Sequence, residues 1–226
     1  MHNLWLDSNK VHNANSFLNE LRNPYNIIIT DIDGTLAIDW GAFGVPETFL
    51  IYNKKIFLDL KLHDIPNTVH ETILGFNDCT IEMMTVHLSG GEQMLRKAML
   101  AAQAVKTKII GVSVLTSLNE SDSLTLFNNN IGDQVINLFK LAKQTNLDGI
   151  VCSPHEVEVA NTILDSHSIK ITPGIRDFKV EDDQARTMNA KDAIKKGATF
   201  LVIGRPITQA TDIPLALKSF NDSIYE

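Results

Sequence analysis

Residues 55–69, KIFLDLKLHDIPNTV, combine a short apolar strand with the proline that ends it. The run from Lys55 to Leu60 is rich in β-forming residues, and Pro66 cannot continue a β-ladder. Similar short runs recur along the chain with amphipathic stretches between them. The predicted strands are residues 3–6, 26–30, 55–60, 81–87, 108–115, 149–153, 169–173 and 199–204.

Eight strands that alternate with helices predict a parallel (β/α)8 barrel, also called a TIM barrel, formed by residues 1–226 as a single domain. An open doubly wound sheet is the alternative, because periodicity does not reveal whether a barrel closes. Residues 13–22 predict one of the helices. A second helix is predicted between Asn189, a suitable N-cap, and Gly197, a suitable residue just past the C-cap. In both folds the chemistry belongs at the C-terminal ends of the strands.

The composition is that of a soluble globular protein, with 44% hydrophobic and 21% charged residues among 226. No apolar stretch is long enough to cross a bilayer, and the N-terminus lacks the pattern of an export signal. The net charge of −7 argues against a nucleic-acid surface. Cys79 and Cys152 have no metal-binding spacing and predict no disulfide framework. We therefore expect a cytoplasmic protein with no membrane or nucleic-acid partner.

The strand within residues 55–69 also carries polar groups. Alternate side chains of a strand share a face, so Phe57, Asp59 and Lys61 are predicted to lie together. Asp59 and Lys61 would be roughly 6.6 Å apart along the strand, and Asp64 follows where the strand ends. An ammonium among carboxylates is a positioned proton donor. The alternative is an ordinary ion pair at the surface.

This stretch resembles the active-site signature of the orotidine 5′-monophosphate decarboxylase family. Further blocks resemble that family in the same order, and they are residues 84–91, 111–117, 147–156, 171–176, 182–186 and 200–209. The opening LWLDSNK is similar to the first strand of the family. The resemblance implies decarboxylation of orotidine 5′-monophosphate to UMP, the last step of de novo pyrimidine synthesis, with no metal or other cofactor, in a homodimer with shared active sites.

The resemblance also implies residue roles. Lys61 would protonate C6 of the pyrimidine, with Asp59 near the departing carboxylate. Asp64, with Ile65 and Thr68, would reach the site of the second subunit. The implied substrate-binding set is Asp7 and Thr68 for the ribose, Thr116 for the base, Gln184 for base and phosphate, Gly204 and Arg205 for the phosphate, and Pro173, Arg176 and Ile65 beside them. Residues 174–186 are predicted to form a lid.

Some of these residues have simpler interpretations. Thr116 and Gln184 could be loop residues without a ligand, and Gly204 with Arg205 could form only a tight turn. His87, at the end of a predicted strand, is predicted to be structural rather than catalytic. His63 is given no role.

Residues 26–40, NIIITDIDGTLAIDW, pose a separate question. Asp31 and Asp33 resemble the first motif of haloacid-dehalogenase-type phosphatases, but the other motifs of that class do not follow strands here. In the barrel, residues 26–30 are the second strand, where the decarboxylase family carries a lysine. No lysine occurs between Lys10 and Lys54.

Three hypotheses follow from that difference. The first is a weakened or compensated decarboxylase, and the second is a nucleotide-binding homologue without activity. The third is a Mg²⁺-dependent enzyme similar to 3-keto-L-gulonate 6-phosphate decarboxylase, in which Asp31 or Asp33 joins Asp59 at the metal. We rank them in that order.

Overall fold

The computed structural model describes residues 48–52, 55–176 and 187–225. The strands in this part are β1 (Thr48–Tyr52), β2 (Lys55–Leu62), β3 (Ile81–His87), β4 (Lys108–Val112), β5 (Gly149–Val151), β6 (Ile169–Thr172) and β7 (Phe200–Leu201). The helices are α3 (Pro66–Leu74), α4 (Gly91–Val105), α5 (Glu120–Phe127), α6 (Ile131–Gln144), α7 (Val157–Ile163), α8 (Ala190–Lys195), α9 (Arg205–Thr208) and α10 (Ile213–Tyr225), with a 3-10 turn η2 (Leu88–Gly90).

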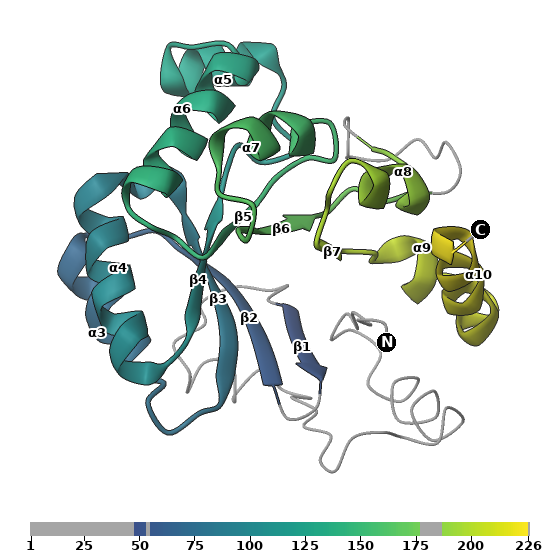
Figure 1. Ribbon diagram of the computed structural model, residues 1–226, viewed down its shortest axis with the longest axis horizontal. Helices are drawn as coiled ribbons and strands as arrows, with labels where there is room; N and C mark the ends of the chain where they lie inside the picture. Colours follow the sequence, from purple (N-terminus) through teal and green to yellow (C-terminus); the bar gives the residue numbers. More distant parts are fainter. Residues whose placement is uncertain (1–47, 53–54, 177–186, 226) are drawn as a thin grey trace.

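The described strands form one sheet in sequence order, and β2 to β7 all run parallel. From β2 to β7, helices connect each strand to the next, and the helices follow the outer side of the curved sheet, from α3 and α4 to α8 and α10 (Figure 1). This is the predicted (β/α)8 barrel architecture, seen over six consecutive parallel strands. The predicted strands 3–6 and 26–30 and the predicted helix 13–22 lie outside the described residues.

Both faces of the sheet are apolar, as a parallel barrel requires. A large core on the helix side includes Leu58, Met84, Ile109 and Ile150. A second, smaller cluster on the opposite face joins side chains from all six parallel strands: Phe57, Met83, Ile110 and Ile171, with Val151, Ile169, Phe200 and Val202 packed against them. That cluster marks the barrel interior. The inner face of β2 is therefore the face of Phe57.

β1 differs from the sequence prediction, which placed no strand at residues 48–52. It pairs antiparallel with β2, from Thr48 opposite Asp59 to Tyr52 opposite Lys55. In the predicted barrel the neighbour on this side of β2 is a parallel strand. Only two residues separate β1 from β2, a connection short enough for an antiparallel pair but not for a parallel one.

Four strands end earlier than predicted: β4 at Val112, β5 at Val151, β6 at Thr172 and β7 at Leu201. The chain beyond these ends stays buried at Val114, Cys152 and Ile203. Cys152 still donates its backbone N–H to the carbonyl of Ile171, although none of these three residues belongs to a strand. A hydrophobic pattern reports burial and cannot locate the last ladder hydrogen bond. The functional loops therefore begin earlier than the apolar runs suggested.

The predicted signals at the two ends of α8 are confirmed. The Asn189 side chain accepts a hydrogen bond of 2.8 Å from the backbone N–H of Asp192. Gly197, directly after the C-cap, has a φ of +104°, a conformation that favours glycine. None of the helices in the described part of the chain has the length and apolar character of a membrane span.

Candidate active site

β2 presents Asp59 and Lys61 on the inner face of the sheet, as predicted. Phe57, two residues earlier, belongs to the interior cluster, whereas Leu60 and Leu62 pack against the helix-side core. The Lys61 Nζ donates a hydrogen bond of 2.6 Å to Oδ2 of Asp59. The Asp59 side chain is only 15% exposed and that of Lys61 is 39% exposed, so a covered carboxylate anchors a partly accessible ammonium.

Thr85 of β3 is a third member of this group, and it was not among the site residues predicted from the sequence. Its hydroxyl donates to Oδ1 of Asp59 at 2.7 Å and accepts the backbone N–H of Lys61 at 2.8 Å. Thr85 has no exposed surface. Each oxygen of the Asp59 carboxylate therefore has its own donor. The sequence signal was the polar residue two positions before His87 on the same strand face.

The pairing of β2 with β3 is irregular at the ion pair. Between the Leu58–Met84 and Leu62–Val86 pairs, β2 contributes three residues and β3 only Thr85. Lys61 has a φ of +50°, which is uncommon for a residue with a side chain. The alternation of side chains in the sequence predicts a regular strand here. No glycine or asparagine marks this position, so the sequence carried no signal for the left-handed conformation.

Two histidines lie beside the pair. The rings of His63 and His87 have centroids 5.2 Å apart. Burial, then the neighbouring His63 and Lys61, lower the pKa of His87 from 6.5 to about 4, while Asp59 acts in the opposite direction. His87 is therefore neutral at neutral pH, beside the charged Lys61. It therefore adds no positive charge near the lysine.

Asp64 and Ile65 lie on the connection from β2 to α3, Thr68 lies in the first turn of α3, and all three are exposed. Oδ1 of Asp64 accepts the backbone N–H of Ile65 at 2.6 Å. The Ile65 side chain is 68% exposed, although it is large and apolar. These three residues are therefore available to a second molecule.

The other described candidates follow the parallel strands β4, β6 and β7. Thr116 lies in the turn after β4, Pro173 and Arg176 follow β6, and Gly204 caps α9 with Arg205 as its first residue. Since the carboxyl ends of parallel strands share one end of the sheet, all of them lie at the same end as Lys61. Asp7 and Gln184 lie outside the described residues.

A backbone bridge joins the start of the predicted lid to the residues that follow its end. Ile175 and Met188 form a parallel bridge, in which the N–H of Arg176 donates to Met188 O at 2.9 Å. The guanidinium of Arg176 is buried and donates from Nη1 to the carbonyl of Ile175 at 2.9 Å. Residues 177–186, which make up most of the predicted lid, lie outside the described residues.

Comparison with known proteins identifies the family. The profile of the family described as "Orotidine 5'-phosphate decarboxylase / HUMPS family" matches residues 4–220. The chain belongs to this family. An "Orotidine 5'-phosphate decarboxylase" of Wolbachia pipientis subsp. Culex pipiens is 41% identical over 222 residues, 96% of this chain and 97% of the relative. A relative of the same name from Ehrlichia chaffeensis is 46% identical over 159 residues, 70% of this chain and 69% of the relative.

A solved structure agrees with this assignment. The crystal structure of orotidine 5'-phosphate decarboxylase from Lactobacillus acidophilus matches with a TM-score of 0.65 and 35% identity, over 76% of each chain. The family match also includes residues 26–40, the stretch that resembled a phosphatase motif. That stretch is part of the decarboxylase family match rather than of a phosphatase, and the phosphatase interpretation is not favoured.

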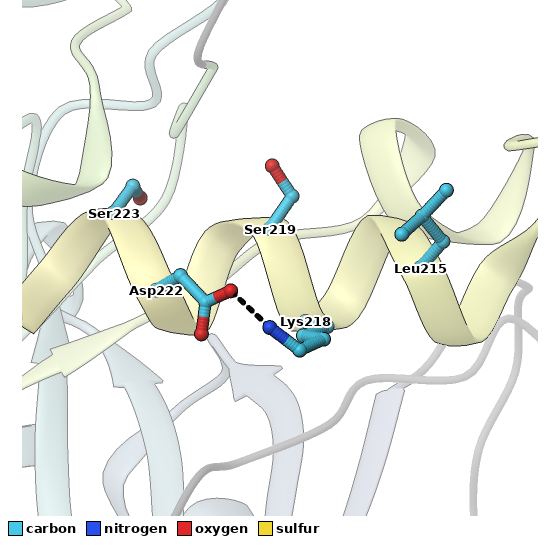
Figure 2. Close-up of a pocket in the computed structure, with 5 residues that line it drawn as sticks. All are labelled: Leu215, Lys218, Ser219, Asp222 and Ser223. Carbon is cyan, nitrogen blue, oxygen red and sulfur yellow. Dashed lines mark hydrogen bonds and ion pairs between the residues drawn. The ribbon is translucent and has the colours of Figure 1, made fainter.

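A hollow of about 360 Å³ lies elsewhere, along one helix. Figure 2 shows its lining residues, all from α10: Leu215, Lys218, Ser219, Asp222 and Ser223. Lys218 and Asp222 form an ion pair one turn apart. None of the predicted catalytic residues lines this hollow. Within residues 48–52, 55–176 and 187–225, no three His, Cys, Asp or Glu side chains gather in a way that could hold a metal ion. Asp31 and Asp33 lie outside those ranges.

Proposed function

We propose that this chain decarboxylates orotidine 5′-monophosphate to UMP and carbon dioxide without a metal or an organic cofactor. One observation carries the proposal: an ammonium held by a covered carboxylate at the C-terminal end of a barrel strand, Lys61 against Asp59 at 2.6 Å. It occurs in a chain that is 41% identical, almost end to end, to a relative named for this reaction.

The chemistry follows from the charges. Loss of carbon dioxide breaks the bond between C6 and the carboxylate and leaves the electron pair on C6. A fixed ammonium stabilises that developing charge because it is oriented before the reaction starts. The proton on Nζ of Lys61 then moves to C6, and the neutral amine regains a proton from water. Asp59 holds the ammonium in place and lies beside the carboxylate that leaves.

Substrate binding is assigned to the loops at the same end of the barrel. Gly204 and Arg205 follow β7, where such barrels commonly bind phosphate, and they would hold the phosphate with Arg176 and Pro173. Thr116 would contact the base. Asp7 would bind the ribose, and Gln184 would contact both the base and the phosphate. Binding energy from the remote phosphate would then lower the barrier at C6.

We further propose a homodimer in which Asp64, Ile65 and Thr68 complete the site of the second subunit. The exposure of all three, between the end of β2 and the first turn of α3, supports this. We also propose that the chain is one barrel domain, since the described strands form a single sheet. A cytoplasmic location fits Cys79 and Cys152, which are not joined in a disulfide.

One assay tests the function. Purified protein is mixed with orotidine 5′-monophosphate in EDTA, and the loss of substrate absorbance is followed. Turnover in the chelator is the expected result. Tight binding of a UMP-like anion without turnover would instead identify a nucleotide-binding homologue. Activity only with Mg²⁺ and a keto-sugar phosphate would identify the metal-dependent alternative.

Two lysine variants test the role of Lys61. Lys61→Ala is expected to abolish turnover. The variant should still bind the UMP-like anion, because Arg205 would continue to hold its phosphate. Lys108→Ala is the matched control, because Lys108 also pairs with a carboxylate, that of Glu82, but at the start of its strand. Lys108→Ala should keep wild-type turnover. Equal losses in both variants would assign the effect to general stability.

A mixing experiment tests the shared site. Lys61→Ala and Asp64→Ala are each expected to be inactive alone. If Asp64 acts in the second subunit, random re-assortment restores one intact site in half of the dimers, about a quarter of the wild-type activity. No recovery on mixing would place both residues in the site of one subunit.

A further inference from the structure

We propose that Thr85 is a positioning residue that sets the geometry of both Asp59 and Lys61. The inference rests on the proposed function, since it names a residue that acts through the ion pair of that site. Thr85 lies on β3, on the strand next to the pair, and its side chain is completely buried. It is thus held by its own surroundings and does not depend on substrate for its orientation.

The direction of the Thr85 hydroxyl is determined by its two partners. A hydroxyl has one proton to donate and two lone pairs that accept. The backbone N–H of Lys61 can only donate, and it occupies a lone pair of the hydroxyl at 2.8 Å. The carboxylate of Asp59 can only accept, and it lies 2.7 Å away. The hydroxyl proton therefore points at Oδ1 of Asp59.

These contacts close a ring. Starting from Lys61, the backbone N–H reaches Thr85, the hydroxyl reaches Asp59, and the other carboxylate oxygen receives Nζ of Lys61 at 2.6 Å. The ring links the main chain of the lysine to its own ammonium through two neighbours. A rotation of the carboxylate would break at least one of the three hydrogen bonds.

The irregular strand pairing explains why a side chain is needed here. Three residues of β2 lie opposite Thr85 alone, and Lys61 has a φ of +50°. The backbone N–H of Lys61 donates to the Thr85 hydroxyl, a side-chain acceptor in place of a ladder carbonyl. Without that acceptor, the N–H would lose its partner in a partly buried place. Thr85 thus supports a backbone conformation that L residues rarely adopt.

Thr85→Val removes the hydroxyl and keeps the shape of the side chain. We expect kcat to fall about tenfold to hundredfold, the equivalent of one charge-assisted hydrogen bond, while KM changes little because Thr85 has no exposed surface for a nucleotide to contact. Thr85→Ser keeps the hydroxyl and should restore most of kcat. A Val variant as active as the wild type, or a Ser variant as slow as Val, would overturn the proposal.

The matched control is Thr107→Val. Thr107 is also buried, and its hydroxyl donates to the carbonyl of Ile81 at 2.9 Å, at the start of β3 and far along that strand from Thr85. This variant loses a buried hydrogen bond without touching the ring of contacts around Lys61. Its stability should fall while its kcat stays at the wild-type value. A drop in kcat equal to that of Thr85→Val would reduce Thr85 to a structural residue.

Amide hydrogen exchange at Lys61 gives a readout that needs no turnover. The amide should be protected in the wild type and in Thr85→Ser, and should exchange about tenfold faster or more in Thr85→Val. Unchanged protection overturns the proposal even if activity falls. If the wild type does not decarboxylate, the proposed function fails, and this measurement still decides the role of Thr85. Should Thr85→Val not fold, Thr85→Cys, a weaker donor and acceptor, replaces it and should give faster exchange than Ser.

Discussion

His87 should make the stability of this protein fall in mild acid. His87 is the last residue of β3, and its ring lies beside that of His63. Burial is the main cause that lowers the pKa of His87 from 6.5 to about 4, followed by the charges of His63 and Lys61. In the unfolded chain the ring is solvated and takes up a proton near pH 6.5. Between these two pH values the unfolded chain therefore binds more protons than the folded one.

The sign and size of the effect follow from linkage. Where the unfolded state binds more protons, the free energy of unfolding rises with pH, so the contribution of neutral His87 is complete above about pH 6.5 and is lost as pH falls toward 4. With those two pKa values and a fully buried ring, the free energy of unfolding of the protein would fall by about 2 kcal/mol between pH 7.5 and pH 5. Because the ring is only partly buried, we expect about 1–2 kcal/mol from His87.

Urea unfolding at about pH 7.5 and pH 5 measures this loss, with the protein concentration held constant because a dimer would otherwise change the midpoint. The wild type should lose more stability than His87→Gln across this range, and the difference is the contribution of His87. His167→Gln is the matched control, because His167 is exposed. It should lose as much stability as the wild type. If His87→Gln is as acid-sensitive as the wild type, the ring is not held neutral by its surroundings.

Substitutions at three positions test the helix-side core, a close approach between two strands and a helix cap. Ile73→Ala empties a fully buried position on α3 and should cost about 2–5 kcal/mol by urea unfolding, against about 0.5–1.5 kcal/mol for Ile73→Val; equal costs would contradict tight packing there. Gly149→Ala would put a Cβ 2.3 Å from the carbonyl oxygen of Ile169 and force β5 and β6 apart, so thermal unfolding should show a loss of about 1–3 kcal/mol, and an unchanged midpoint would disprove the close approach. Asn189→Ala removes the N-cap of α8 and should cost about 1 kcal/mol in the same measurement, whereas Asn189→Ser, which can still cap, should stay near wild type.

Much of the local structure could be predicted because its causes are local. The strand at residues 81–87 has the predicted bounds. The cap at Asn189 and the positive φ at Gly197 depend on residue chemistry within one helical turn. The shared face of Asp59 and Lys61 follows from strand alternation. That prediction requires no knowledge of the neighbouring strands.

Other features depend on which strand lies beside which. The antiparallel β1 and the early end of β4 are decided by hydrogen bonds to a neighbouring strand, and the apolar pattern of either segment does not contain that information. Nor did the sequence single out Thr85, which is one threonine among many until β3 is laid against β2.

The sequence by itself determined the alternation of strands and helices, the family and the residues that carry charge. Only the tertiary structure decided how that charge is held: the left-handed backbone at Lys61 and the buried hydroxyl that joins it to Asp59. The physical reason is separation along the chain. A periodic pattern records which face a side chain takes, but a hydrogen bond between residues 24 positions apart exists only when the fold brings them together.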